Sequence, residues 1–157
     1  MKKRIALILL AVFAVAQLIQ PDRSVPTPVP VNDMLTMTQA PPDIRTLVEG
    51  ACYDCHSDKS NYPWYAYITP ANFWLQSHIN EGREKMNFTR WNDPASREEA
   101  YECGEVLKEG EMPPSNYAFI HGHAKLTDEQ RARLVDWFDA TMPKEEEKGE
   151  EEEHGRS

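Results

Sequence analysis

The chain has 157 residues, with 17 Lys or Arg and 26 Asp or Glu, and a formal net charge of −9. This length predicts one domain once the ends are set aside. Because nucleic acid is itself negatively charged, an acidic chain is not expected to bind it. The charge favours either plain solubility or a partner protein with a basic docking surface.

Residues 1–20 predict an export segment. Lys-Lys-Arg at 2–4 forms a basic start, and an uninterrupted apolar run follows over 5–16, with apolar character continuing to Ile19. This suits a signal peptide better than a membrane span of ~20 apolar residues, and Ala-Val-Ala at 14–16 resembles a cleavage site. A retained N-terminal membrane anchor is the alternative. Either way the domain is expected in the periplasm, free or anchored to the inner membrane.

Two further segments are expected outside the folded domain. Residues 21–42 are rich in proline, which fixes φ and lacks an amide hydrogen, so they predict an extended, stiff tether. A tether is useful when the N-terminus stays in the membrane, which favours the anchor. Residues 143–157 are mostly Glu and Lys and predict a disordered, solvated tail. The remaining residues, 43–142, have the size of one small domain.

Helical patterns without convincing strand alternation predict an all-α domain. The first helix is expected over about 43–50 and leads directly into Cys52; one face carries Ile44, Leu47 and Val48. The second is expected from Thr69-Pro70, an N-cap followed by proline at the first helical position, to about Lys85. One side of this helix carries Phe73, Trp74 and Ser77.

The third and fourth helices are each expected to open on a capping box, a Ser or Thr followed three residues later by Glu or Gln. The third starts at Ser96-x-x-Glu99 and stops at Gly110, with an apolar face of Ala100, Cys103, Val106 and Leu107. Cys103 is therefore predicted to be a small core residue, with an intermolecular disulfide as the alternative. The fourth starts at Thr127-x-x-Gln130, ends at Pro143, and carries Leu134, Trp137, Phe138 and Thr141 on one face. We expect the first and fourth helices to pack against each other.

The pattern C-x-x-C-H at Cys52, Cys55 and His56 is the strongest chemical signal in the chain. Two thiols at this spacing can add across the two vinyl groups of haem and form two thioether bonds. The next residue, His56, then lies under the iron as its proximal ligand. The pattern predicts one covalently attached haem c.

Three other uses of the cysteines compete with haem. The pair could be a thiol–disulfide redox motif, but the expected preceding strand and βαβ pattern are absent from the sequence. It could be half of a zinc site, for which His121 and His123 are a weak second pair. It could also be a plain disulfide, with His56 incidental.

A second iron ligand is expected from a methionine, because iron in electron-transfer cytochromes c is usually held by His and Met. Met112 is the first candidate, since it precedes Pro113 and Pro114 in a loop that the prolines stiffen. Met86 is the second candidate. His78 lies in the middle of a predicted helix and is expected to be a surface or partly buried histidine.

Four aromatic residues gather in the short loop over 61–68: Tyr62, Trp64, Tyr65 and Tyr67. We expect Trp64 and Tyr65 in particular to wall the haem pocket and exclude water. The alternative is that these aromatic residues belong to the general core or form a surface patch that binds a partner. An apolar wall would favour the reduced iron, because it removes the solvent that stabilises ferric charge.

Over 43–142 the sequence resembles the haem-binding-domain family of bacterial cytochrome c-like proteins. The residues that carry the resemblance are Cys52-Tyr53-Asp54-Cys55-His56-Ser57, Tyr62-Pro63-Trp64-Tyr65, Glu81-Gly82-Arg83, Met86-Asn87-Phe88 and Gly110-Glu111-Met112-Pro113-Pro114. The resemblance implies a small helical cytochrome c-like fold, with Cys52, Cys55 and His56 as haem attachment and Met112 in the family's methionine-proline segment. Arg83 also matches, and its charge suggests a hypothesis that it neutralises a haem propionate.

These observations favour an electron carrier, with six-coordinate iron and no substrate, over an enzyme. A haem-based sensor or peroxidase-like enzyme needs a displaceable sixth ligand and distal acid–base groups such as His78 or His121, and is the main alternative. A third hypothesis is an envelope module in which haem serves mainly to stabilise a small fold.

Overall fold

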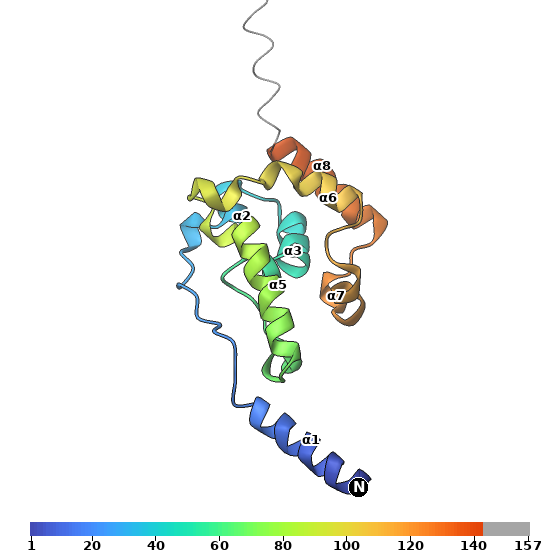
Figure 1. Cartoon of the computed structure of the whole chain (residues 1–157). Coiled ribbons are helices and arrows are strands. Elements are labelled where there is room, and N and C mark those ends of the chain that lie inside the picture. Colours follow the sequence, from blue (N-terminus) through green and yellow to red (C-terminus); the bar gives the residue numbers. More distant parts are fainter. Residues whose placement is uncertain (143–157) are drawn as a thin grey trace, which may run out of the picture.

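The computed structural model describes residues 1–142. These residues form an all-α protein with no strand, as the sequence predicts (Figure 1). The α-helices are α1 (Lys2–Ala16), α2 (Met34–Met37), α3 (Pro42–Ala51), α4 (Tyr53–His56), α5 (Ala71–Lys85), α6 (Cys103–Lys108), α7 (Ser115–Ile120) and α8 (Asp128–Thr141). Short 3₁₀ turns lie between them: η1 (Pro30–Asn32), η2 (Trp64–Tyr67), η3 (Phe88–Arg90), η4 (Pro94–Arg97), η5 (Ala100–Glu102) and η6 (Gly122–Ala124).

Helices α3, α6 and α8 meet in the main hydrophobic core. Leu134 and Phe138 on α8 are buried with Ile44 and Val48 on α3 and Leu107 on α6. Helix α8 begins as predicted, because Thr127 accepts a hydrogen bond from the backbone of Gln130 and the Gln130 side chain bonds back. The helix expected over 43–50 is α3, and its predicted packing against the last helix, α8, is confirmed.

Helix α5 has the predicted length but turns a different side to the domain. Its buried residues are Asn72, Leu75, Gln76, Ile79 and Gly82, whereas Phe73 and Trp74 are exposed. The polar members of this stripe find partners inside the fold: the Asn72 amide donates to Thr69 Oγ1, and Gln76 accepts from the Tyr62 hydroxyl. The predicted cap is also wrong, since Pro70 occupies the N-cap position and no side chain caps the helix.

The predicted capping box at Ser96 is wrong. Asp93, three residues earlier, accepts a hydrogen bond from the backbone of Ala95 and starts η4 instead. The α-helix therefore begins only at Cys103, after η5. The apolar positions are nevertheless confirmed, because Ala100, Cys103 and Leu107 are buried, and Gly110 has a φ of 77° just after α6.

The segment expected to be a tether over 21–42 contributes to the core. Residues 21–29 lack helix, but Met34 and Leu35 are fully buried. Asp33 caps α2 by accepting from the Leu35 backbone, and it also accepts from the Tyr53 hydroxyl at 2.7 Å. Residues 33–40 thus belong to the packed domain. The predicted tail over 143–157 lies outside the described residues.

Helix α1 has no buried residue and leaves the domain near the end at which α5 begins (Figure 1). Within residues 1–142, no helix has both the length and the apolar character needed to cross a membrane.

Candidate functional site

A mostly apolar cavity lies between the Cys52–His56 turn, α5, α6 and the loop before α7. It encloses about 950 Å³ of space free of atoms, part of it open to solvent. The cavity brings together all three cysteines, His56, and both candidate methionines. Its lining consists of Ala51, Cys52, Cys55, His56, His78, Glu81, Gly82, Lys85, Met86, Phe88, Cys103, Val106, Leu107, Met112, Pro113, Pro114, Tyr117 and Phe138.

The C-x-x-C-H motif forms one tight helical turn at the end of α3. The Cys52 amide donates to Val48 O at 2.9 Å, and the His56 amide donates to Cys52 O at 2.9 Å. This turn places both sulfur atoms and the imidazole against the same cavity. The sequence therefore predicted correctly which three residues would lie together.

The imidazole of His56 is held by the backbone of the segment after α5. Its Nδ1 lies 3.3 Å from Met86 O, and its ring packs 5.9 Å from that of Phe88. When Nδ1 carries the proton and donates to this carbonyl, Nε2 keeps its lone pair for a metal. Burial is the main cause that lowers the pKa of His56, which keeps the ring in the neutral form that binds iron.

The cysteines do not have the properties of a thiol–disulfide redox motif. Burial raises the pKa of the Cys52 thiol to about 12 and that of the Cys55 thiol to about 11, whereas redox-active cysteines have a lowered pKa. None of the three cysteines is in a disulfide. Residues 1–142 also contain no group of three or more His, Cys, Asp or Glu side chains that could hold a metal, which disfavours the zinc alternative.

Met112 reaches the cavity from the loop after α6, and Arg131 fixes this loop. One guanidinium nitrogen of Arg131 donates to Leu107 O and to Met112 O, both at 2.7 Å. The Met112 amide donates to Val106 O, which closes the loop back onto α6. The segment that carries the candidate sixth ligand is therefore tied to α6 and α8.

Met86 also lines the cavity, but other contacts occupy it. Its carbonyl faces His56, and its sulfur accepts a weak hydrogen bond from the Cys103 thiol at 3.6 Å. Cys103 is buried, as predicted for a small core residue. These contacts favour Met112 over Met86 as the methionine that would bind iron together with His56.

Three polar residues lie at the rim of the cavity, and the sequence analysis had named only His78 among them, as a distal group for the enzyme or sensor alternative. His78, Glu81 and Lys85 lie along α5, are exposed, and line the opening. They lie on one side of the helix at a spacing of three or four residues. This spacing indicates a shared helix face in the sequence, but not that the face borders a cavity. Lys85 is the only Lys or Arg in the cavity lining, so it is better placed than Arg83 to face a haem propionate.

Trp64, Tyr65 and Arg83, which were predicted to contact haem, are not among the residues that line the cavity. Trp64 is exposed. The Tyr65 hydroxyl forms a hydrogen bond with His121 Nε2 at 3.1 Å. Neither residue lines the cavity. Arg83 donates to Ser57 O at 2.8 Å and to Ser60 Oγ at 2.9 Å, so its guanidinium supports the chain just after the motif instead of the cavity.

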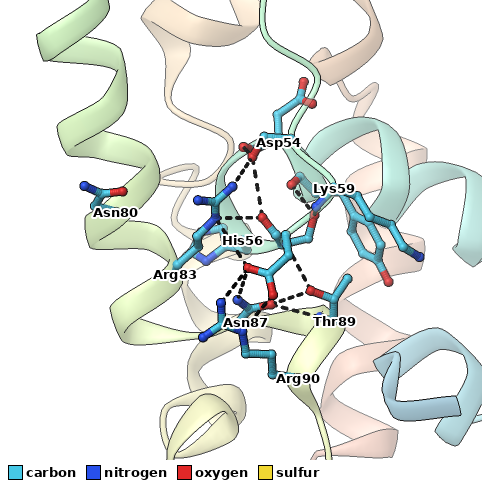
Figure 2. A network of polar contacts seen from close by, with 12 residues as sticks. Asp54, His56, Lys59, Asn80, Arg83, Asn87, Thr89 and Arg90 are labelled. Atoms are coloured by element: carbon cyan, nitrogen blue, oxygen red, sulfur yellow. Dashed lines mark hydrogen bonds and ion pairs between the residues drawn. The ribbon is translucent and has the colours of Figure 1, made fainter. Parts of the chain in front are cut away.

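A buried polar network, whose members Asn87 and Arg90 are labelled in Figure 2, surrounds the Asp58 carboxylate two residues after the motif. Arg90 donates two hydrogen bonds to the Asp58 carboxylate, at 2.7 and 2.9 Å, and the Asn87 amide donates at 3.1 Å. Burial raises the pKa of Asp58, but these bonds outweigh it and lower the pKa on balance. The network joins the segment after His56 to the segment after α5. It therefore holds the backbone next to both partners of the contact between His56 and Met86.

The model of the haem-binding domain family matches residues 11–140. The chain belongs to this family. The sequence is also similar to the cytochrome c peroxidase Ccp of Escherichia coli (strain K12), with 28% identity over 98 residues, which are 59% of this chain and 21% of that protein. The chain thus spans about a fifth of the length of that relative. No solved structure matches the chain.

The cavity of this haem-binding protein fits the group that the family implies. The donor set consists of two thiols, one imidazole with Nδ1 directed at a carbonyl, and a thioether on a fixed loop. The surrounding lining is largely apolar, as an aromatic macrocycle requires, and its few charged groups lie at the opening, where propionates would meet solvent.

Proposed function

We propose that this haem-binding protein is a mono-haem c-type cytochrome that transfers electrons outside the cytoplasm. Cys52 and Cys55 hold the haem covalently, and His56 and Met112 bind its iron. The observation that carries the proposal is the His56 ring, whose Nδ1 faces Met86 O in a cavity that also contains Met112 and both thiols.

The attachment chemistry needs no oxidant. Each thiol adds across one vinyl group, so that sulfur bonds to one carbon and the thiol hydrogen goes to the other. The raised pKa values of Cys52 and Cys55 refer to the folded chain, where both thiols are buried. Attachment before the cavity closes is consistent with this burial.

When bound, haem supplies an iron that changes between the ferric and ferrous states. The residues of the chain hold it in place and control its surroundings. Met86 O orients the imidazole of His56, and Arg131 holds the loop of Met112. Phe88, Leu107 and Phe138 give the cavity an apolar lining, which favours the reduced iron.

Charge and the N-terminal sequence support the proposed partner and location. The basic residues at 2–4 contribute +3 and the tail from Lys144 contributes −4, which leaves −8 for the rest of the chain. A redox partner with a basic docking surface suits this acidic domain, and nucleic acid does not. The export segment supports a periplasmic location, free or anchored to the inner membrane.

A peroxidase-like enzyme or sensor is the second candidate. His78 and Glu81 at the cavity rim could supply distal acid–base groups, and the curated relative is named a cytochrome c peroxidase. This function requires that the sixth ligand leave the iron easily.

Absorption spectra distinguish the two candidates. The protein is produced with a c-type haem maturation system, and its ferric and ferrous spectra are compared with those of Met112→Ala and Met86→Leu. We expect low-spin iron in the wild type and in Met86→Leu, with a weak far-red sulfur-to-iron band that is lost in Met112→Ala. Carbon monoxide should bind only the ferrous Met112→Ala protein. High-spin iron in the wild type would overturn the electron-carrier proposal in favour of the enzyme or sensor.

A further inference from the structure

Two stretches of the chain contain no Asp, Glu, Lys or Arg: residues 5–21 and residues 61–80. Charged residues make up 27% of the whole sequence, so two uncharged stretches of this length are unusual for it. The first is mostly α1. The second contains η2 and residues 71–80 of α5.

Both stretches expose large apolar side chains. Helix α1 buries none of its residues, and Leu7, Leu9, Leu10 and Phe13 are among those exposed. In the second stretch, Trp64, Tyr67, Phe73 and Trp74 are 76, 57, 42 and 48% exposed. We call these four residues the aromatic end of the domain. Exposed apolar surface of this extent marks an interaction site.

Hydrogen bonds join the two stretches. The Gln17 side chain pairs with the backbone of Thr69 in both directions, accepting from Thr69 N at 2.9 Å and donating to Thr69 O at 3.2 Å. Next to this pair, the Thr69 hydroxyl donates to Ile19 O, and the Asn72 amide donates to Gln20 Oε1, both at 3.1 Å. We call these bonds the clasp.

Arg23 extends the clasp along the chain. Its guanidinium lies 4.8 Å from the centroid of the Tyr67 ring and donates to Ala66 O. The segment after α1 is thereby fixed to the aromatic end, so the two apolar surfaces lie at the same end of the molecule (Figure 1).

We propose that this end of the molecule binds a lipid surface, with α1 in the apolar region and the aromatic end at the level of the headgroups. Tryptophan and tyrosine suit this zone because one part of each side chain is apolar and another part forms hydrogen bonds. The basic residues 2–4 attract anionic headgroups, and the acidic surface of the domain lies outside the two uncharged stretches.

A lipid surface explains the composition better than a protein partner. A protein interface normally has a polar rim, whereas residues 5–21 and 61–80, which the clasp joins, contain no Asp, Glu, Lys or Arg. The proposal also sets the distance between the haem cavity and the lipid surface. Gly82 lies nine residues after Phe73 on α5, so the cavity is held ~14 Å from the aromatic end, at ~1.5 Å per helical residue.

The first experiment is co-flotation of the full-length, haem-loaded chain with vesicles of phosphatidylethanolamine and phosphatidylglycerol. Hydrogen–deuterium exchange of the bound protein is then read over 64–74, with 115–120 on α7 as the internal reference. We expect the protein to float with the vesicles and the exchange over 64–74 to slow. A protein that does not float, or that floats without protection over 64–74, would overturn the proposal.

Two pairs of substitutions sharpen the result. Trp64→Ser with Phe73→Ser should weaken vesicle binding about tenfold. The matched control, Phe119→Ser with Ile120→Ser, removes side chains on α7 that are 88 and 61% exposed and should change binding less than twofold. Equal losses in the two pairs would contradict a specific role for the aromatic end.

The clasp is tested with Gln17→Ala and Gln20→Ala together. Vesicle binding should persist through α1, while the protection over 64–74 is lost because the domain is no longer held against the surface. Protection over 64–74 that appears without vesicles and grows with protein concentration would show that a second copy of the chain covers this end, and the lipid proposal would be wrong. None of these outcomes depends on which residue binds the iron.

Discussion

Gly82 of α5 lies directly against the carbonyl oxygen of Cys55. A Cβ at position 82 would come within 2.8 Å of this oxygen, closer than Cβ atoms approach such atoms in real proteins. Because Gly82 is buried and the group that an added Cβ would meet is backbone, the contact cannot be relieved without shifting α5 or the Cys52–His56 turn. The absence of a side chain at this position therefore sets the distance between the motif and the helix beside it.

We predict that Gly82→Ala destabilises the protein by about 1–3 kcal/mol, as overpacking of a dense core does. The displaced turn should also lower the fraction of chains that carry attached haem. Thermal unfolding and the haem-to-protein absorbance ratio measure the two effects. Gly122→Ala is the control, since no atom lies within 4 Å of its added Cβ. Equal unfolding temperatures for the two variants would show that α5 adjusts freely.

Arg131→Gln should loosen the hold on Met112, because the shorter amide cannot reach Leu107 O and Met112 O together. We expect imidazole to bind the ferric protein at least about tenfold more tightly, since Met112 is displaced more easily, and the far-red band to weaken. Arg133→Gln removes the same charge two residues away, from an exposed pair with Asp43. If both variants bind imidazole equally, Arg131 has no positioning role.

Asp58→Asn should lower the free energy of unfolding by about 2–3 kcal/mol, the size expected when a buried, charge-assisted hydrogen-bond set is broken. The substitution leaves Arg90 and Arg83 without the carboxylate that they face at 2.7 and 3.9 Å. Urea denaturation of the haem-loaded protein measures the loss. Asp43→Asn, which disturbs only the exposed pair with Arg133, should have little effect, and a loss as large as that of Asp58→Asn would contradict this account.

Met34→Ala should cost about 2–5 kcal/mol, because it leaves a cavity in the core next to α3. Val31→Ala, three residues earlier and exposed, serves as the control. A small effect of Met34→Ala in urea denaturation would restore the interpretation of residues 33–40 as a tether.

The sequence was sufficient where the structural signal is local. The C-x-x-C-H spacing is one helical turn, so the grouping of Cys52, Cys55 and His56 does not depend on the rest of the fold. The capping box at Thr127 is likewise complete within four residues. The box at Ser96 failed because Asp93 and Pro94 offer a competing start three residues earlier, and only the folded chain decides between them.

Distant packing accounts for the other errors. The inner side of α5 includes Asn72 and Gln76, whose partners include Gln20 and Tyr62 outside the helix, so the pattern of apolar residues pointed to the wrong side. Helix α2 has four residues, too few to show a helical period. Arg131 is an ordinary surface residue in the sequence, and its two carbonyl acceptors come from another helix and loop. The aromatic content of 61–68 indicated an apolar surface. It did not show whether these side chains would line the haem cavity or stay exposed at the aromatic end.

The contact between His56 and Met86 has a wider implication. Its acceptor is a main-chain oxygen, so any amino acid at position 86 can provide it. The electron density that the imidazole would offer to the iron is thus tuned by the path of the backbone after α5, not by the identity of a neighbouring side chain. A substitution at position 86 would keep this acceptor, whereas a one-residue insertion between Gly82 and Phe88 would move it away from the ring.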